Sequence, residues 1–112
     1  MRRMTTLSLP PLLAAMVAAH NEHDVDAFLA CFAEDAIVRA DGGVYFGPAA
    51  IRSWFEQFSR LRQPVLEVHE LSSLDGEPML TGRLIEDVAE RSTVRYWLGV
   101  DDDKIVALKI IR

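Results

Sequence analysis

Residues 32–58 constrain the fold of this chain most strongly, because they predict a tight hairpin followed at once by a helix. Two short β-prone runs, 36–40 and 44–46, flank the turn-forming sequence Asp41-Gly42-Gly43. Gly47-Pro48 then predicts a helix start, since proline suits the first helical turn. Its apolar residues recur at the spacing of one helical face: Ile51, Trp54, Phe55 and Phe58. We expect this face to cover the concave side of a sheet built from the second half of the chain, with a small ligand bound between them.

The second half of the chain alternates β-prone runs with turn signals. The runs predict strands at 65–74, 79–88, 93–100 and 105–111. Asp75-Gly76 is typical of a hairpin turn, and Asp101-Asp102-Asp103 indicates a solvated turn. Links this short predict an antiparallel meander, because parallel strands need a long crossover. The fold class predicted is therefore α+β, with N-terminal helices packed in a strongly curved antiparallel sheet and all 112 residues in one domain.

Two helices are predicted before the hairpin. The first covers residues 8–21, with Ser8 as its cap and Pro10 in its first turn. Asp24 is expected to cap the second helix, which would bury Val25, Phe28, Leu29 and Phe32. An alternative for the N-terminus is a secretory signal, because Arg2-Arg3 precedes an apolar run. The helical periodicity of that run favours a helix that stays in the mature protein.

Composition limits the partners and the compartment. The net charge of −5 argues against nucleic acid, whose binding proteins usually carry a basic face. The apolar runs are too short to span a membrane, so no membrane partner is expected. A single cysteine, Cys31, allows no internal disulfide and favours the cytoplasm. We expect no cofactor and no metal, since His20-x-x-His23-Asp24 has no further ligand nearby.

Several predicted strands are apolar on both faces. Trp97 alternates with Tyr96 and Leu98, and the last strand is apolar throughout. One face would pack on the helices, whereas the other would stay exposed in a monomer. A second copy of the chain is the simplest cover, so the sequence predicts a homodimer through the outer face of the sheet.

Several short motifs together resemble the SnoaL-like branch of the nuclear transport factor 2-like superfamily, which includes ketosteroid isomerases, polyketide cyclases and limonene epoxide hydrolases. The motifs are His20-Asn21, Asp24-Val25-Asp26-Ala27-Phe28, Cys31-Phe32-Ala33-Glu34-Asp35-Ala36-Ile37-Val38 and Tyr45-Phe46-Gly47-Pro48-Ala49-Ala50-Ile51. The resemblance implies a cone-shaped, cystatin-like α+β roll with an apolar pocket for a small hydrophobic metabolite. It also implies cofactor-free isomerase, cyclase or hydrolase chemistry. The alternative is a non-catalytic ligand-binding or protein-interaction module, because one fold can carry unrelated functions.

The residues that carry these activities in relatives are not matched here. The positions of the isomerase base, tyrosine donor and late-strand acid are occupied by Ala40, Met16 and Tyr96, so we expect no ketosteroid isomerase activity. The epoxide hydrolase pattern is an arginine flanked by two carboxylates. Arg83 is its nearest candidate, although Glu86 lies three residues further on and therefore across the pleat.

Four polar residues are the candidates for catalysis. His20 would exchange a proton near neutral pH at the pocket mouth, although pairing with the carbonyls at the helix end is the favoured alternative. Asp41 would act as a base if a bulge turned it inward, and otherwise belongs to the turn. Tyr96 and Arg83 would bind a ligand carbonyl or carboxylate, with a cross-strand ion pair as the alternative for Arg83. The residues expected to line the pocket are Met16, Val38, Trp54, Phe58 and Leu98.

Overall fold

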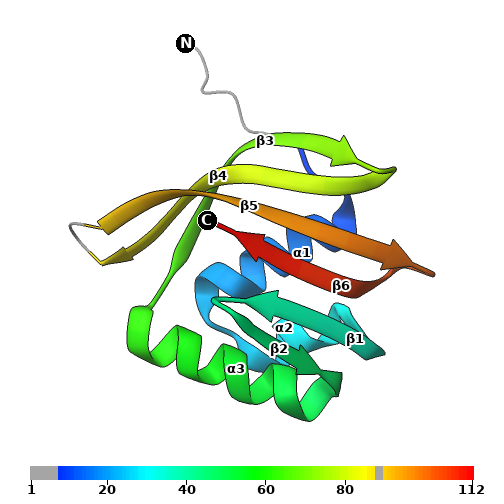
Figure 1. The fold of residues 1–112 in the computed structure, drawn as a ribbon, viewed down its shortest axis with the longest axis horizontal. Coiled ribbons are helices and arrows are strands. Elements are labelled where there is room, and N and C mark those ends of the chain that lie inside the picture. The colour runs from blue at the N-terminus through cyan, green and yellow to red at the C-terminus, as the bar shows by residue number, and fades with distance from the viewer. Residues whose placement is uncertain (1–7, 88–89) are drawn as a thin grey trace.

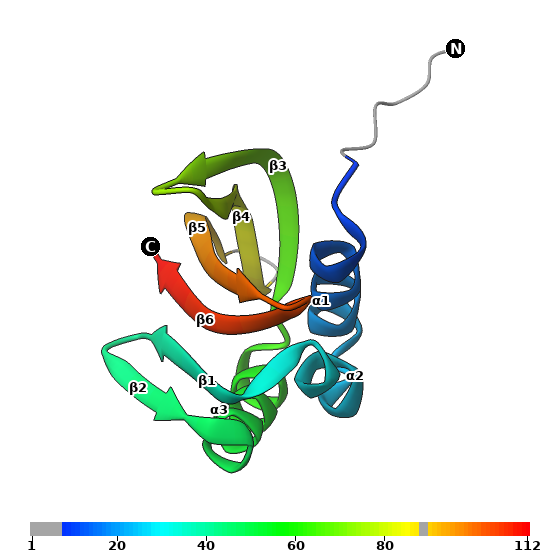
Figure 2. The same cartoon turned by 90° about the vertical axis from the view of Figure 1, so that its right-hand side faces the viewer.

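A computed structural model describes residues 8–87 and 90–112. One curved sheet holds helices on its concave side (Figures 1 and 2). The elements are α1 (Pro11–Glu22), α2 (Val25–Ala30), β1 (Phe32–Ala40), β2 (Gly43–Phe46), α3 (Gly47–Arg62), β3 (Val65–Leu74), β4 (Glu77–Asp87), β5 (Glu90–Asp101) and β6 (Lys104–Ile111). The strands are ordered β2-β1-β6-β5-β4-β3, so the sheet is open with β2 and β3 at its edges. The predicted α+β class and curved sheet are confirmed.

The strand pairing is antiparallel except at one place. Strands β3 to β6 form the predicted meander. Strand β1, however, pairs in parallel with β6, with Val38 opposite Leu108. No short turn links these two strands, so no local signal in the sequence indicates the pair. The predicted antiparallel sheet therefore contains one parallel pair that the prediction did not include.

The helix ends show where local signals held and where packing overrode them. Asp24 caps α2 as predicted, since its Oδ1 accepts from the Ala27 N–H at 3.1 Å. Helix α1 is preceded by Pro10 without a side-chain cap, so the prediction that Ser8 caps it was wrong. Phe32 opens β1 rather than ending α2. The Ile105 N–H donates to the Cys31 carbonyl at 2.9 Å, so pairing with the last strand takes over where α2 ends.

Helix α3 starts and ends where the sequence indicated, but it covers a different part of the sheet. It packs on β1, β2 and α2, whereas α1 packs on α2 and β3. Figure 1 shows α3 beneath the hairpin, and Figure 2 shows α1 beside the meander. The expected cover of the C-terminal strands by α3 is therefore corrected. The buried face of α3 joins an aromatic core in which the Phe28 and Phe55 rings stack at 3.9 Å.

The curvature of the sheet has a local cause in β4. Gly82 is buried, and a Cβ atom there would collide with the backbone carbonyl of Glu67 on β3. The register of β3 with β4 shifts between Val68 and Glu70, next to this close approach. A glycine beside a bulge allows strands to bend sharply. Beside this bend, β3 packs against α1.

Some predictions fall outside the described residues. Arg2 and Arg3, on which the secretory alternative rests, lie there, as do Val88 at the end of a predicted strand and Ala89 in the turn after it. Within residues 8–87 and 90–112, no helix is long and apolar enough to cross a membrane.

Candidate functional site

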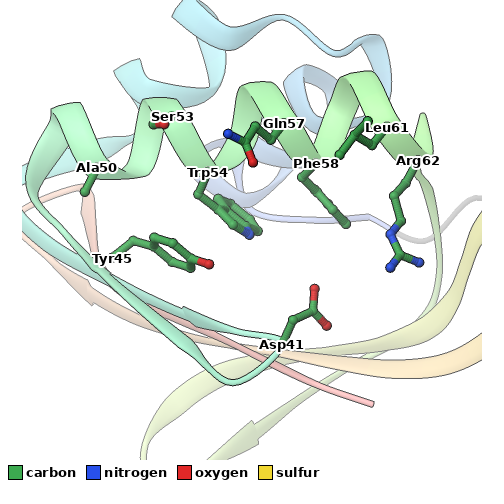
Figure 3. Close-up of a pocket in the computed structure, with 9 residues that line it drawn as sticks. All are labelled: Asp41, Tyr45, Ala50, Ser53, Trp54, Gln57, Phe58, Leu61 and Arg62. Atoms are coloured by element: carbon green, nitrogen blue, oxygen red, sulfur yellow. The ribbon is translucent and has the colours of Figure 1, made fainter.

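A cleft of about 390 Å³ lies between α3 and the β1–β2 hairpin (Figure 3). We call it the hairpin cleft. Its lining residues are Asp41, Tyr45, Ala50, Ser53, Trp54, Gln57, Phe58, Leu61 and Arg62. The Trp54 ring stacks on Tyr45 at 5.9 Å and on Phe58 at 5.2 Å. A row of flat rings with a few polar groups is typical of a site for a small organic ligand.

Asp41 brings a carboxylate into the hairpin cleft. Strand alternation predicted that it would point to the face opposite Ala40, which is buried in the core. Asp41 instead begins the turn, in the left-handed region with a φ of 51°. This conformation breaks the alternation and directs the side chain towards α3 (Figure 3). A bulge was the feature expected to turn Asp41 inward, and the turn itself produces this orientation.

Asp41 belongs to a network of charges at one end of the cleft. Its Oδ1 accepts from Arg112 Nε at 3.1 Å. Arg112 also donates through both terminal nitrogens to the two oxygens of Glu86, each at 3.0 Å. The Glu86 side chain is only 7% exposed, and Arg62 lies 3.5 Å from one of its oxygens. The structure thus places an arginine between two carboxylates, but the arginine is Arg112 rather than Arg83.

Arg62 and Arg112 were missed as site residues. Asp41 directly follows β1 and Arg112 directly follows β6, and parallel neighbours end at the same edge of a sheet. If the β1–β6 pair had been known, Asp41 and Arg112 could have been predicted to lie close together. Without it, the sequence contains no signal that joins positions so far apart.

His20 and Tyr96 form a pair inside the core. The Tyr96 O–H donates to His20 Nε2 at 2.8 Å, and His20 is fully buried with 0% exposure. Asn21 fixes the tautomer, because its amide nitrogen donates to the Leu66 carbonyl while its Oδ1 accepts from the Leu66 N–H. His20 Nδ1 lies 2.9 Å from that same Oδ1 and must therefore carry the proton. The imidazole bonds to Asn21 and Tyr96 and not to carbonyls at the helix end, so that expectation was wrong. It is also buried in the core, so the expectation that it lies at a pocket mouth was wrong.

Burial governs the protonation of this pair. Desolvation lowers the pKa of His20 from 6.5 to about 4, with a smaller lowering by His23 and a partial offset from the hydrogen bond to Asn21. Desolvation also raises the pKa of Tyr96 above its ordinary value. At neutral pH both groups are therefore neutral. The expectation that His20 exchanges protons near pH 7 is corrected.

A comparison with protein families identifies the group to which this fold belongs. The SnoaL-like domain matches residues 13–108, which include all three helices in large part and all six strands to Leu108. The chain belongs to the SnoaL-like family. No match is found among curated proteins.

Solved structures place the SnoaL-like chain among proteins of the same fold. A candidate polyketide cyclase from Sinorhizobium meliloti is 24% identical with a TM-score of 0.83, covering 91% of this chain and 94% of that chain. An uncharacterised cystatin-fold protein from Novosphingobium aromaticivorans is 21% identical with a TM-score of 0.77, covering 90% and 95%. A hypothetical protein with a ketosteroid isomerase-like fold from Catenulispora acidiphila, in complex with trimethylamine, is 15% identical with a TM-score of 0.78, covering 94% and 87%. These likenesses establish the cystatin-like, ketosteroid isomerase-like fold.

The SnoaL-like fold separates the predicted site residues into three groups. Asp41, Trp54 and Phe58 line the hairpin cleft. A second group is buried in the core, namely Met16, His20, Val38, Tyr96 and Leu98. Arg83 is exposed on the other face of β4 from the buried Leu84. Phe58 joins the first two groups, because its ring lies edge-on to His20 at 5.9 Å and so stands between the cleft and the core pair.

Proposed function

We propose that the hairpin cleft binds a small, flat, mainly apolar organic molecule. One observation carries the proposal: the Asp41 carboxylate faces a continuous wall of stacked rings from Tyr45, Trp54 and Phe58. The wall favours a cyclic body through stacking and apolar burial. The carboxylate would then accept a hydrogen bond from a polar or acidic group on that body.

We propose two roles for this binding. In the first, the protein is a cofactor-free enzyme in which Asp41 takes a proton from the ligand. Arg112 donates to one Asp41 oxygen and the carboxylate lines the cleft, which suits a positioned base. In the second, the protein binds the ligand without turnover. The neutrality of His20 and Tyr96 favours this second role, because neither supplies a readily exchanged proton at pH 7.

Fluorescence tests the site directly, because the two tryptophans of the chain lie on different faces. Trp54 lines the hairpin cleft, whereas Trp97 is half-buried on the outer face of β5. A compound found in a thermal-shift screen of small cyclic metabolites should quench the parent protein and Trp97→Phe alike. Trp54→Phe should lose the response. A response that survives in Trp54→Phe and disappears in Trp97→Phe would place the ligand outside the cleft and refute the proposal.

We also propose that the chain forms a homodimer through the outer face of the sheet. Phe46, Ile37 and Ala107 are paired across this face, and Ala107 pairs in turn with Gly99. The Trp97 ring lies beside Gly99, and Trp97 pairs with Met79, so these side chains form an apolar row. Phe46 is 67% exposed, which is unusual for so large an apolar side chain. Such a row would be covered by the same row of a second copy related by a two-fold axis.

Light scattering at micromolar concentration should give about twice the monomer mass of 12.6 kDa. Ile37→Asp should shift the mass to that of a monomer, because it buries a charge in the proposed interface. Ala49→Asp, on the exposed side of α3, is the matched control and should remain dimeric. A monomeric parent protein would refute the dimer.

We propose, finally, that the chain acts as a single domain in the cytoplasm. Its one cysteine, Cys31, is buried and free. A fold that needs no disulfide suits a reducing compartment.

A further inference from the structure

We propose that the hairpin cleft selects organic anions, and that Arg62 is the residue that recognises the anionic group. This inference rests on the proposed function, because it names the class of ligand for the same cleft. The ligand would be a flat ring carrying a carboxylate or an enolate. Its ring would lie on the aromatic wall, with its charge at the end of α3.

The two arginines of the cleft network differ in how far they are already satisfied. Arg112 donates to Asp41 and, through two bonds, to Glu86, so two carboxylates neutralise it. Among the described residues, Arg62 has one ion-pair contact, at 3.5 Å, with a Glu86 oxygen that already accepts from Arg112 at 3.0 Å. That contact is longer than a good N–H···O hydrogen bond. Of the two cleft arginines, Arg62 is therefore the one with donors left for a ligand, judged from residues 8–87 and 90–112.

The position of Arg62 on α3 aligns it with the aromatic wall. Trp54, Phe58 and Arg62 are spaced four residues apart, so they follow one another along one face of the helix. All three line the cleft, and Figure 3 shows the guanidinium beyond the Phe58 ring. The Arg62 side chain is 53% exposed, so an arriving ligand reaches it without rearranging the core. A flat acid lying along the wall would bring its charged group to Arg62.

Asp41 determines the orientation of such a ligand in the cleft. Its carboxylate faces the same space as Arg62 and would repel an anionic group placed beside it. The charge of the ligand therefore belongs on Arg62, and an O–H or an acidic C–H of its ring belongs at Asp41. Glu86 also lies 3.5 Å from Arg62, but its two oxygens already accept from Arg112, so its charge is neutralised when the anionic group of the ligand arrives.

Calorimetric titration with 2-naphthoate and 2-naphthamide separates charge from shape. The two probes share a ring system and differ in the charge of one group. We expect the acid to bind about 10-fold to 100-fold more tightly than the amide, as one charge-assisted bidentate contact would give. Arg62→Gln should remove this preference and leave the affinity for the amide unchanged.

Arg60→Gln is the matched control, because Arg60 is exposed on the same helix end but does not line the hairpin cleft. It should keep the preference for the acid. Equal binding of the two probes, or a preference that survives in Arg62→Gln, would overturn the inference and leave the cleft as a neutral binding site. Failure of both probes to bind would overturn the inference together with the proposed function.

Discussion

The free energy of unfolding is expected to fall by about 3 kcal/mol between pH 7 and pH 4 through His20 alone. The folded protein holds the pKa of His20 at about 4, against 6.5 for an ordinary histidine. Between these two values the unfolded chain binds the proton and the folded chain does not. Stability is therefore complete above pH 6.5 and is lost as the pH falls towards 4. About 2 kcal/mol of the loss should occur above pH 5, where carboxylates contribute less.

Urea unfolding at a series of pH values measures this effect, with His20→Gln as the comparison. The variant has no group to protonate, so the stability difference from the parent protein should shrink by about 2 kcal/mol between pH 7 and pH 5. His69→Gln removes an exposed histidine of β3 and serves as the control. Parallel pH profiles for the parent protein and His20→Gln would show that His20 is not held neutral by the core.

Asp41→Asn is expected to lower kcat/KM by about 10²-fold to 10⁴-fold for any substrate that the cleft turns over, which is the usual contribution of a positioned base. Asparagine keeps the shape of the side chain and tolerates the left-handed turn, but it cannot take a proton. Quenching of Trp54 by the substrate should persist, so the loss would appear in catalysis and not in binding. Asparagine also removes the charge that pairs with Arg112 at an exposed position, which should change stability little.

Asp75→Asn is the matched control for Asp41→Asn. Asp75 also precedes a glycine in a hairpin and also has a positive φ, of 56°, but it lies in the β3–β4 turn and does not line the hairpin cleft. It should retain full activity. If Asp41→Asn remains fully active, Asp41 is not the base and the binding role alone stands.

The fold could be predicted where each element carried its own signal. Val65–Leu74 is a strand with the predicted bounds, and α3 begins at the predicted Gly47. The cap at Asp24 and the turn at Asp41-Gly42 could also be predicted, because both depend only on neighbouring residues. Phe32 could not be predicted in this way, because it lies in a strand only through its pairing with Ile105 of β6, more than half the chain away. Local propensity yields to tertiary pairing at such positions.

The site was predictable only in part, for the same reason. The aromatic spacing of α3 identified Trp54 and Phe58, and turn chemistry drew attention to Asp41. Arg62 and Arg112 depend on which strand ends share an edge, which sequence spacing does not reveal. The neutrality of His20 depends on the Phe28, Phe55, Phe58 and Tyr96 rings that enclose it. Desolvation by residues so distant in sequence cannot be judged before the fold is known.

The parallel β1–β6 pair has a consequence for the order in which the protein folds during synthesis. Strand β6 lies between β1 and β5, so without it the sheet separates into the hairpin and the three-stranded remainder of the meander. The hairpin with α3 leaves the ribosome early, yet its sheet partner at residues 104–111 is made much later. Contacts between residues so far apart in sequence form slowly, because the chain loses the entropy of the intervening loop before the contacts can stabilise it. The edge of β1 that pairs with β6 therefore stays unpaired until residues 104–111 are made. A chaperone that binds β1 on the nascent chain would have the time between the synthesis of the two strands in which to act.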